Sequence, residues 1–242
     1  MNFLLIETAS SVCSVAAATE EKIISIRENA EAMQHAALVT VFAEEVMNEA
    51  GFLFSDKSKD KNQKSKMLDA VVVSAGPGSY TGLRIGVSAA KGISYAANLP
   101  LIAVDTLEAF ANGFAQKRNF PSANNEPQAT ICSVFDARRD EIYFGIWKPN
   151  GDTIIKSRAA LLNNEFLSII NSIESKIYFV GNGSKKVGEF LKNNKHEYHQ
   201  HINPSASYLQ SISVQKFLRK EIADLAYFEP NYIKPYFFAE KM

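Results

Sequence analysis

The chain has 242 residues, a length that suits one large domain or two smaller ones. Hydrophobic residues make up 46% and charged residues 21%, which excludes disorder or low complexity as a description of the whole chain. Lys plus Arg and Asp plus Glu both number 26, so the formal net charge is zero. This balance argues against a protein that grips a nucleic acid by itself, because phosphate neutralisation usually requires a basic excess.

Cysteine usage and hydropathy bear on the compartment. Cys13 and Cys132 lie far apart and form no CxxC pair, which is typical of small buried thiols in a reducing environment. The first apolar run covers only Phe3 to Ile6 and follows no basic segment, so no signal peptide is expected. No stretch approaches the ~18 apolar residues of a membrane span. We therefore expect a cytoplasmic protein without a membrane partner.

The first half of the chain predicts a mixed sheet with helices on both faces, because three hairpin-linked strands precede alternating helices and strands. The expected elements are strands at 2–6, 12–18 and 22–28, a helix at 31–50, a strand at 68–74, a helix at 83–97, a strand at 101–104 and a helix at 107–117. Residues 55–66 hold five lysines and two aspartates without an apolar residue. A solvated loop is the favoured interpretation of that run, and an RNA-contacting loop is the alternative.

The second half weakly echoes the first. Residues 118–128 are rich in Pro and Asn and predict a linker, so we expect domains at 1–117 and 118–242, with the final helices able to pack back on the first domain. The expected elements are strands at 129–135, 141–147 and 153–158, a helix at 164–173, a strand at 177–181, a helix at 184–193, two helices near 205–219 and 220–227, and an extended end from 229.

The most informative motif is GPGSYTGLRIG, from Gly76 to Gly86, between a strand and a helix. Backbone N–H groups and the positive end of a helix dipole can hold an anion there. The motif is neither a P-loop nor a dinucleotide fingerprint, and Ser79 lacks the flanking glycines of a nucleophile elbow. A ligand cradle and a structural turn are about equally compatible with the loop itself. Its candidate ligand-binding residues are Gly76, Gly78, Ser79 and Gly82.

The motif in context resembles the TsaB (YeaZ) family, which belongs to the wider glycoprotease or M22-like group. The opening LLIETASSVCSVA, the stretch AKGISYA, the strand and helix PLIAVDTLEAFA, the segment DARRDEIY and the closing EPNYIKP resemble the same family's landmarks in the same order. The resemblance implies a two-domain α/β architecture, the actin-like ATPase (ribonuclease H-like) fold, with mixed sheets flanked by helices.

The resemblance also implies a function. The family takes part in forming threonylcarbamoyladenosine on tRNA, beside the anticodon, as a non-catalytic subunit that binds and activates a catalytic paralogue, TsaD. A TsaE-like ATPase is the implied third partner. The chain is expected to form a homodimer when alone and to meet tRNA only through the complex.

Two departures bear on chemistry. The catalytic paralogues carry a metal-binding His-x-x-x-His where this chain has Thr106 and Phe110, so we expect no metal site and no transferase activity. In ATP-using proteins of this fold an Asp follows the first strand, whereas this chain has Glu7, next to Thr8. The extra methylene would disturb a tight Mg²⁺ arrangement. A structural turn is therefore favoured for Glu7 and Thr8, and weak ATP or ADP binding is left open.

Several other polar residues match the family's landmarks or stand out without a clear role. Arg84, Asp136 and Arg138 belong to the family motifs, and a hairpin-bracing role for Asp136 and Arg138 is as compatible as a role in a cleft. His35 stands alone on its helix and predicts a capping or interface hydrogen bond. The histidines within 196–201 predict a solvated loop rather than a metal site.

The first two helices predict an interface. Ala37, Leu38 and Val41 fall outside the arc that would cover the sheet, and the helix at 83–97 is apolar or small over more than half its circumference. Candidate interface residues on the second helix are Ile85, Ala89 and Ile93. The resemblance implies that this helix pair docks on the catalytic subunit, while the alternative is that the helices shield each other.

A different class of function is an independent ATP-using or metallopeptidase-like enzyme of the same fold. The peptidase would need metal ligands in place of Thr106 and Phe110, and the kinase would need a phosphate-gripping group in the first turn, of which ETASS supplies little.

Overall fold

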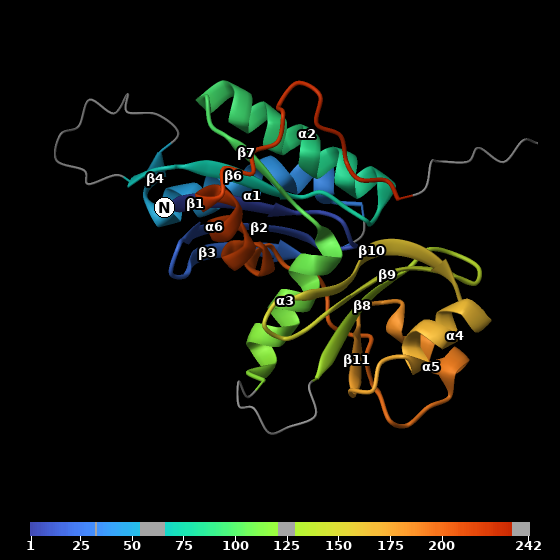
Figure 1. Cartoon of the computed structure of the whole chain (residues 1–242). Coiled ribbons are helices and arrows are strands. Elements are labelled where there is room, and N and C mark those ends of the chain that lie inside the picture. Colours follow the sequence, from blue (N-terminus) through green and yellow to red (C-terminus); the bar gives the residue numbers. More distant parts are fainter. Residues whose placement is uncertain (32, 54–65, 121–128, 234–242) are drawn as a thin grey trace, which may run out of the picture.

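The computed structural model describes residues 1–31, 33–53, 66–120 and 129–233, and it contains two five-stranded mixed sheets of the same topology (Figure 1). Strand order is β3-β2-β1-β6-β7 in the first sheet and β10-β9-β8-β11-β12 in the second. In each sheet three antiparallel strands joined by hairpins are followed by two parallel strands. The second sheet thus repeats the first, which confirms the predicted α/β class.

The first sheet is built around buried, alanine- and valine-rich strands. Its strands are β1 (Asn2–Glu7), β2 (Cys13–Thr19), β3 (Ile23–Asn29), β6 (Ala70–Ser74) and β7 (Leu101–Val104). The helices that connect them are α1 (His35–Ala50) and α2 (Tyr80–Ala97), and a two-stranded parallel pair, β4 (Phe52–Leu53) with β5 (Lys66–Met67), lies between α1 and β6.

The second sheet follows α3 (Thr106–Arg118), a helix with a charged last turn. The strands are β8 (Thr130–Asp136), β9 (Glu141–Trp147), β10 (Thr153–Leu161), β11 (Ile177–Val180) and β12 (Glu197–His199), with α4 (Asn164–Asn171) and α5 (Ser184–Leu191) between them. A 3-10 helix, η1 (Ala206–Leu209), leads into α6 (Gln210–Leu218).

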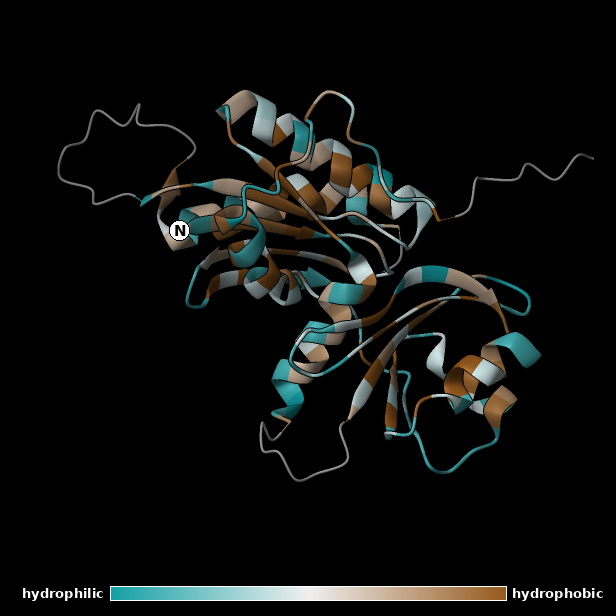
Figure 2. Ribbon diagram, in the orientation of Figure 1, coloured by the Kyte–Doolittle hydropathy of each residue, from teal (hydrophilic) through white to brown (hydrophobic). Residues whose placement is uncertain are grey.

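Three hydrophobic clusters hold these layers together. One lies between α1, α2 and one face of the first sheet, and another lies between the outer face of the second sheet and α4 with α5. The third and largest joins the remaining faces of both sheets through α3, η1 and α6 (Figure 1). The brown ribbon segments of Figure 2 concentrate on the strands and on the helix faces turned toward them. The outward faces of α1 and α2 therefore lie at one end of the stack, away from the second sheet.

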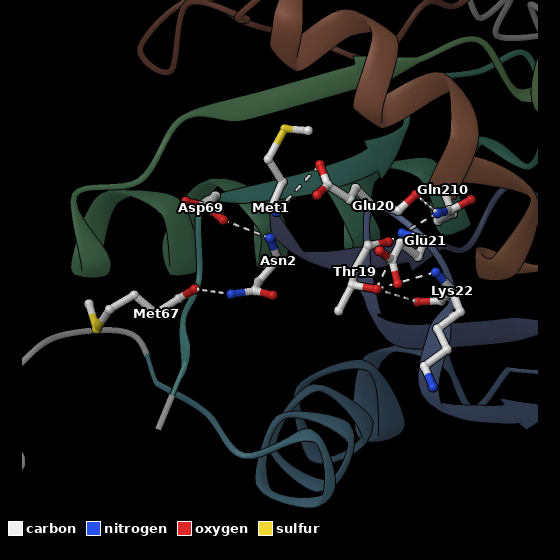
Figure 3. Close-up of polar contacts among 9 residues, drawn as sticks. All are labelled: Met1, Asn2, Thr19, Glu20, Glu21, Lys22, Met67, Asp69 and Gln210. Atoms are coloured by element: carbon white, nitrogen blue, oxygen red, sulfur yellow. Dashed lines mark hydrogen bonds and ion pairs between the residues drawn. The ribbon is translucent and has the colours of Figure 1, made fainter. Parts of the chain in front are cut away.

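Polar contacts fasten one end of the first sheet (Figure 3). The backbone N–H of Asn2 donates to the Asp69 carboxylate at 2.6 Å. The Gln210 amide, from α6, donates to the backbone carbonyls of Thr19 and Glu20 at 3.0 and 2.7 Å. These bonds tie the start of β1 and the β2–β3 turn to their neighbours, at the end of the sheet opposite the glycine loop.

Several helices and strands differ from their predicted bounds, among them β10, which runs to Leu161 instead of 158, and the pair β4–β5, which was not predicted. The first helix begins at His35 rather than 31, because Met33 has a left-handed backbone with a φ of 65°. The second begins at Tyr80 rather than 83, because the Ser79 side chain caps it. A helix at 220–227 is wrong: Lys220 is left-handed and Ala223 instead forms a bridge to Leu101 of β7.

A further difference is β12, where the sequence predicts only a polar loop. Glu197–His199 pair in parallel with β11 at the edge of the second sheet. The predicted linker and lysine-rich loop fall mostly on residues 121–128 and 54–65, which lie outside the described residues, as do 234–242 of the extended end. Among the described residues, no helix has the length and apolar character needed to cross a membrane. Cys13 and Cys132 are buried free thiols, in accordance with the prediction.

Candidate functional site

The glycine loop joins β6 to α2 and is fixed at both ends by the protein itself. Gly76 has a φ of 107°, which favours glycine, and its N–H donates to the Thr106 hydroxyl at 3.0 Å. Ser79 is the N-cap of α2, and its side chain accepts from the N–H of Gly82 at 3.2 Å. On the other side, the N–H of Asn231 donates to the carbonyl of Ala75 at 2.7 Å.

The glycines allow this loop to pack against the turn that follows β1. A Cβ on Gly78 would overlap the carbonyl of Ala9, and a Cβ on Gly82 would overlap the carbonyl of Thr8. The N–H of Ser79 donates to the Ala9 carbonyl at 2.7 Å, and the Thr8 hydroxyl donates to the Gly82 carbonyl at 2.8 Å. The glycines thus have a structural reason inside the chain, and the N–H groups of Gly76, Ser79 and Gly82 already have protein acceptors.

Glu7 lies under this contact and is buried, with 1% of its surface exposed. Its Oε1 accepts from the N–H of Ala9 at 2.6 Å. Burial raises the pKa of Glu7 to about 7, against the opposing effects of the Ala9 hydrogen bond and the nearby Ser74 hydroxyl. Burial and the charge of Glu7 raise the pKa of the Cys13 thiol to about 11. A carboxyl group so enclosed braces the turn, and a metal–phosphate complex would have to displace the turn to reach it.

Thr106 and Phe110, the two positions at which the sequence predicts the loss of a metal site, are buried. Thr106 is the first residue of α3 and has no exposed surface, and its N–H donates to the Gly76 carbonyl at 2.9 Å. Phe110, also fully buried, packs with the rings of Phe135 and Tyr208 in the largest hydrophobic cluster. The described part of the chain contains no group of three or more His, Cys, Asp and Glu side chains that could hold a metal ion.

The outward faces of α1 and α2 form a partly apolar surface. Val41 is 46% exposed and Ala37 is exposed. Leu38 is less exposed than these two, because its side chain packs partly against the hydrophobic cluster beneath α1. On α2 the residues Ile85, Ala89 and Ile93 are likewise partly buried. The six predicted interface residues therefore lie on the outer side of the same two helices, but four of them also contribute to the protein's own core.

Gly92 lies at the centre of the outward arc of α2, and sequence reasoning did not single it out as an interface residue. It is exposed, and a Cβ built on it would meet nothing within 4 Å. Glycine in a helix interior is less stable than alanine by about 1 kcal/mol. No contact among the described residues accounts for this cost, while close approach of another helix would.

Asp136, at the end of β8, braces the β8–β9 hairpin. Its carboxylate accepts from Lys186 of α5 and from the N–H of Arg138, and its own N–H donates to the Asn182 side chain. Arg138 is exposed, and its backbone is left-handed. The predicted bracing role is thus visible for Asp136. Arg84, by contrast, lies on α2 with its guanidinium over the ring of Tyr80, 4.5 Å from the centroid.

Two histidines, His35 and His196, make structural contacts. The Nε2 of His35 lies 3.1 Å from the carbonyl oxygen of Ser10, so this side chain fastens the start of α1 to the turn after β1. His196 is buried, with its Nδ1 accepting from the N–H of Ile177 at 3.3 Å. Its predicted place in a solvated loop is therefore wrong, because the strand after it pairs with β11 and buries its ring.

Comparisons with known proteins bear on the family. A family model described as TsaD, tRNA N6-adenosine threonylcarbamoyltransferase, matches residues 22–235. The tRNA threonylcarbamoyladenosine biosynthesis protein TsaB of Bacillus subtilis is 27% identical over 242 residues, which cover 97% of this chain and 94% of that protein. TsaB of Escherichia coli is 24% identical, covering 97% and 95%. A tRNA N6-adenosine threonylcarbamoyltransferase of Halalkalibacterium halodurans is 40% identical over only 89 residues, 23% of its length.

The chain belongs to the TsaB branch of the TsaD family. The alignments to the TsaB proteins cover 97% of this chain and 94–95% of those proteins, whereas the alignment to the transferase covers 23% of its length. The structure of YeaZ from Pseudomonas aeruginosa superimposes with a TM-score of 0.76 at 23% identity, covering 96% of this chain and 99% of YeaZ. Together with the repeated sheet topology, this confirms the predicted α/β fold of mixed sheets flanked by helices, which the chain shares with YeaZ.

This TsaB-family chain has a second glycine loop, which was not predicted from the sequence. Residues 181–184 read Gly-Asn-Gly-Ser, between β11 and α5, as 76–79 read Gly-Pro-Gly-Ser between β6 and α2. Gly181 has a φ of 114°, and the N–H of Gly183 donates to the carbonyl of Val134 at 3.1 Å. A Cβ on either glycine would crowd β8. Each glycine loop thus packs against the first strand of its own sheet, or the turn after it, and the shared Gly-x-Gly-Ser after a strand was the available signal.

Proposed function

We propose that this chain is a non-catalytic partner subunit of the complex that forms threonylcarbamoyladenosine on tRNA beside the anticodon. In this role it binds and activates a TsaD-like catalytic paralogue. The observation that carries the proposal is the side chain at position 110, because a phenyl ring packed in the core cannot ligate a metal. The hydroxyl of Thr106 already accepts a hydrogen bond from the N–H of Gly76 in the glycine loop. The names of the TsaB relatives support the pathway.

The outward faces of α1 and α2 are the proposed docking surface for the paralogue, with Ala37, Leu38, Val41, Ile85, Ala89 and Ile93 as its residues. Exposed Val41 and the unpacked Gly92 support this assignment. The same surface is proposed to form a homodimer when the paralogue is absent. A TsaE-like ATPase is the further partner, and the bulk of the tRNA contact is proposed to come through the complex.

We further propose that the domains divide at 117/118, next to the end of α3 at Arg118, and that η1 and α6 pack back on the first domain. Nucleotide binding at Glu7, Thr8 and the glycine loop would be weak, because the turn after β1 and the glycine loop already form hydrogen bonds with each other.

Reconstitution tests the proposed function. The purified chain, the TsaD-like paralogue and the TsaE-like ATPase are mixed in all combinations with unmodified tRNA, ATP and threonylcarbamoyl-adenylate, and the modified nucleoside is measured. We expect none from the chain alone and a large gain when it is added to the paralogue. Turnover by the chain alone would instead support an independent enzyme, and a paralogue indifferent to the chain would contradict the activating role.

A further inference from the structure

The zero net charge of the chain conceals an uneven distribution. Residues 1–117 hold ten Lys and Arg against thirteen Asp and Glu, whereas residues 129–218 hold eleven against eight. The remaining segments are balanced. A local excess of one sign creates a field at its own surface whatever the total charge, so the second half can attract a polyanion that the whole chain would not.

Part of this excess lies on the outer side of α5. Lys185 of α5 and Lys192, the residue that ends this helix, are both exposed and line the same hollow of the surface. Between α5 and β12 the surface is hollowed by a cavity of about 380 Å³. Polar side chains line it, namely Lys185, Lys192, Asn193, Asn194, Tyr198 and Gln200, together with Glu189, which lies 3.9 Å from Lys185.

The β8–β9 hairpin adds two arginines next to this helix. Arg138 and Arg139 are exposed, and both have left-handed backbones, with φ of 71° and 48°. This conformation costs a non-glycine residue about 1–2 kcal/mol. Lys186 of α5 holds the hairpin by donating to the Arg139 carbonyl and the Asp136 carboxylate. Within the described residues, neither guanidinium forms an ion pair or a hydrogen bond, so both remain available to a partner.

We propose that the outer face of α5 and the tip of the β8–β9 hairpin bind the phosphate backbone of tRNA. This inference rests on the proposed function and extends it, because the chain itself then supplies part of the tRNA contact. Lys, Arg, Asn, Gln and Tyr are the side chains that contact phosphate and sugar.

A protein partner fits this face less well. None of the large exposed hydrophobic side chains of the described residues lies on α5, on the hairpin tip or on the loop 192–196. Figure 2 shows the chain after α5 in hydrophilic colours. Protein interfaces need an apolar or aromatic centre, whereas a nucleic-acid backbone is bound by charged and polar groups.

The experiment uses the assembled complex with the TsaD-like paralogue and a fluorescent, unmodified tRNA. Binding is followed by anisotropy between about 50 and 200 mM salt. One variant is Lys185→Ala with Lys192→Ala, and a second is Arg138→Gly with Arg139→Gly, in which glycine keeps the left-handed backbone. The control, Lys148→Ala with Lys156→Ala, removes the same charge from β10 and the end of β9.

Each test variant should weaken tRNA binding roughly tenfold or more and reduce the slope of log affinity against log salt by about 1.5, since each lost phosphate contact removes about 0.7–0.9. Affinity for the paralogue should not change. An active complex whose tRNA affinity in both test variants equals that of the control would overturn the inference, as would loss of paralogue binding with an unchanged salt slope. Failure of the proposed function would show differently, as a wild-type chain that neither joins nor activates the paralogue, and it would overturn the inference with it.

Discussion

Replacing Gly92 by alanine should stabilise the isolated chain. Gly92 is exposed in the interior of the 18-residue helix α2, and a Cβ there meets nothing within 4 Å. The substitution removes the entropic cost of glycine without creating a clash, a gain of about 1 kcal/mol. For a chain of this size that gain raises the melting temperature by about 2–4 °C. The measurement is thermal unfolding of the free chain at a concentration where it is monomeric.

The same position should be intolerant of a large side chain in the complex. Helices that pack closely leave no room for one, and overpacking a close contact costs about 1–3 kcal/mol. In the free chain Gly92→Leu should be stabilising by nearly as much as Gly92→Ala, because leucine is also a good helix former and the site is open. Its affinity for the TsaD-like paralogue should fall roughly tenfold to a hundredfold, as measured by titration calorimetry, and self-association should weaken in parallel.

Ser168→Leu is the matched control, because Ser168 is exposed on α4, at the outer face of the second sheet. It places the same side chain on a helix that has no proposed partner. Normal affinity of the Gly92→Leu chain would refute the assignment of the α1 and α2 surface. A destabilised Gly92→Ala chain would refute the reasoning about open space around this glycine.

Two further substitutions test the packing of the first domain. Gly78→Val should lower the free energy of unfolding by about 1–3 kcal/mol, because its Cβ would overlap the Ala9 backbone; an unchanged urea-unfolding curve would contradict this close approach. Val41→Glu should change the stability of the free chain by less than about 0.5 kcal/mol but weaken its binding to the paralogue. Leu38→Glu should lower both the stability and the binding affinity, since Leu38 packs partly on the core. Normal binding by Val41→Glu would place the interface elsewhere.

The fold was largely predictable because its strands are long, apolar and ended by turn residues. The range predicted for β9, 141–147, coincides with the observed Glu141–Trp147, and β7 likewise, at Leu101–Val104. β12 was missed because Glu197–His199 are polar and only three residues long. Its pairing depends on β11 and on the stacking of Tyr198 over Phe179, 5.3 Å between ring centroids, neither of which a local pattern contains.

The candidate site was predictable only in part. The glycines of 76–82 identify a place of close approach, but the approaching group, the Thr8–Ala9 turn, lies about seventy residues away in sequence. Helical periodicity places Leu38 and Val41 outside the core-facing arc, yet it does not reveal that Leu38 leans into the core while Val41 does not. Such differences depend on the neighbouring elements, which sequence spacing does not specify.

Glu7 should make the stability of the chain depend on pH in a recognisable direction. Its pKa is about 7 in the folded chain and near 4.5 when unfolded. Between these values the folded chain holds a proton that the unfolded chain has lost, so stability is fully present below about pH 4.5 and falls as the pH rises through 7. The difference between the two pKa values corresponds to about 3 kcal/mol of unfolding free energy.

Glu7→Gln keeps the acceptor for the Ala9 N–H and removes the titration. The variant should therefore match the wild type near pH 4 and exceed it by up to about 3 kcal/mol at pH 8, in urea unfolding at both pH values. Other titrating groups cancel in this comparison, and Glu44→Gln, the same substitution at an exposed position of α1, is the control for the change of side chain. An equal difference between Glu7→Gln and wild type at both pH values would mean that Glu7 is ionised throughout, and a buried carboxylate of that kind would need a cationic partner beside it.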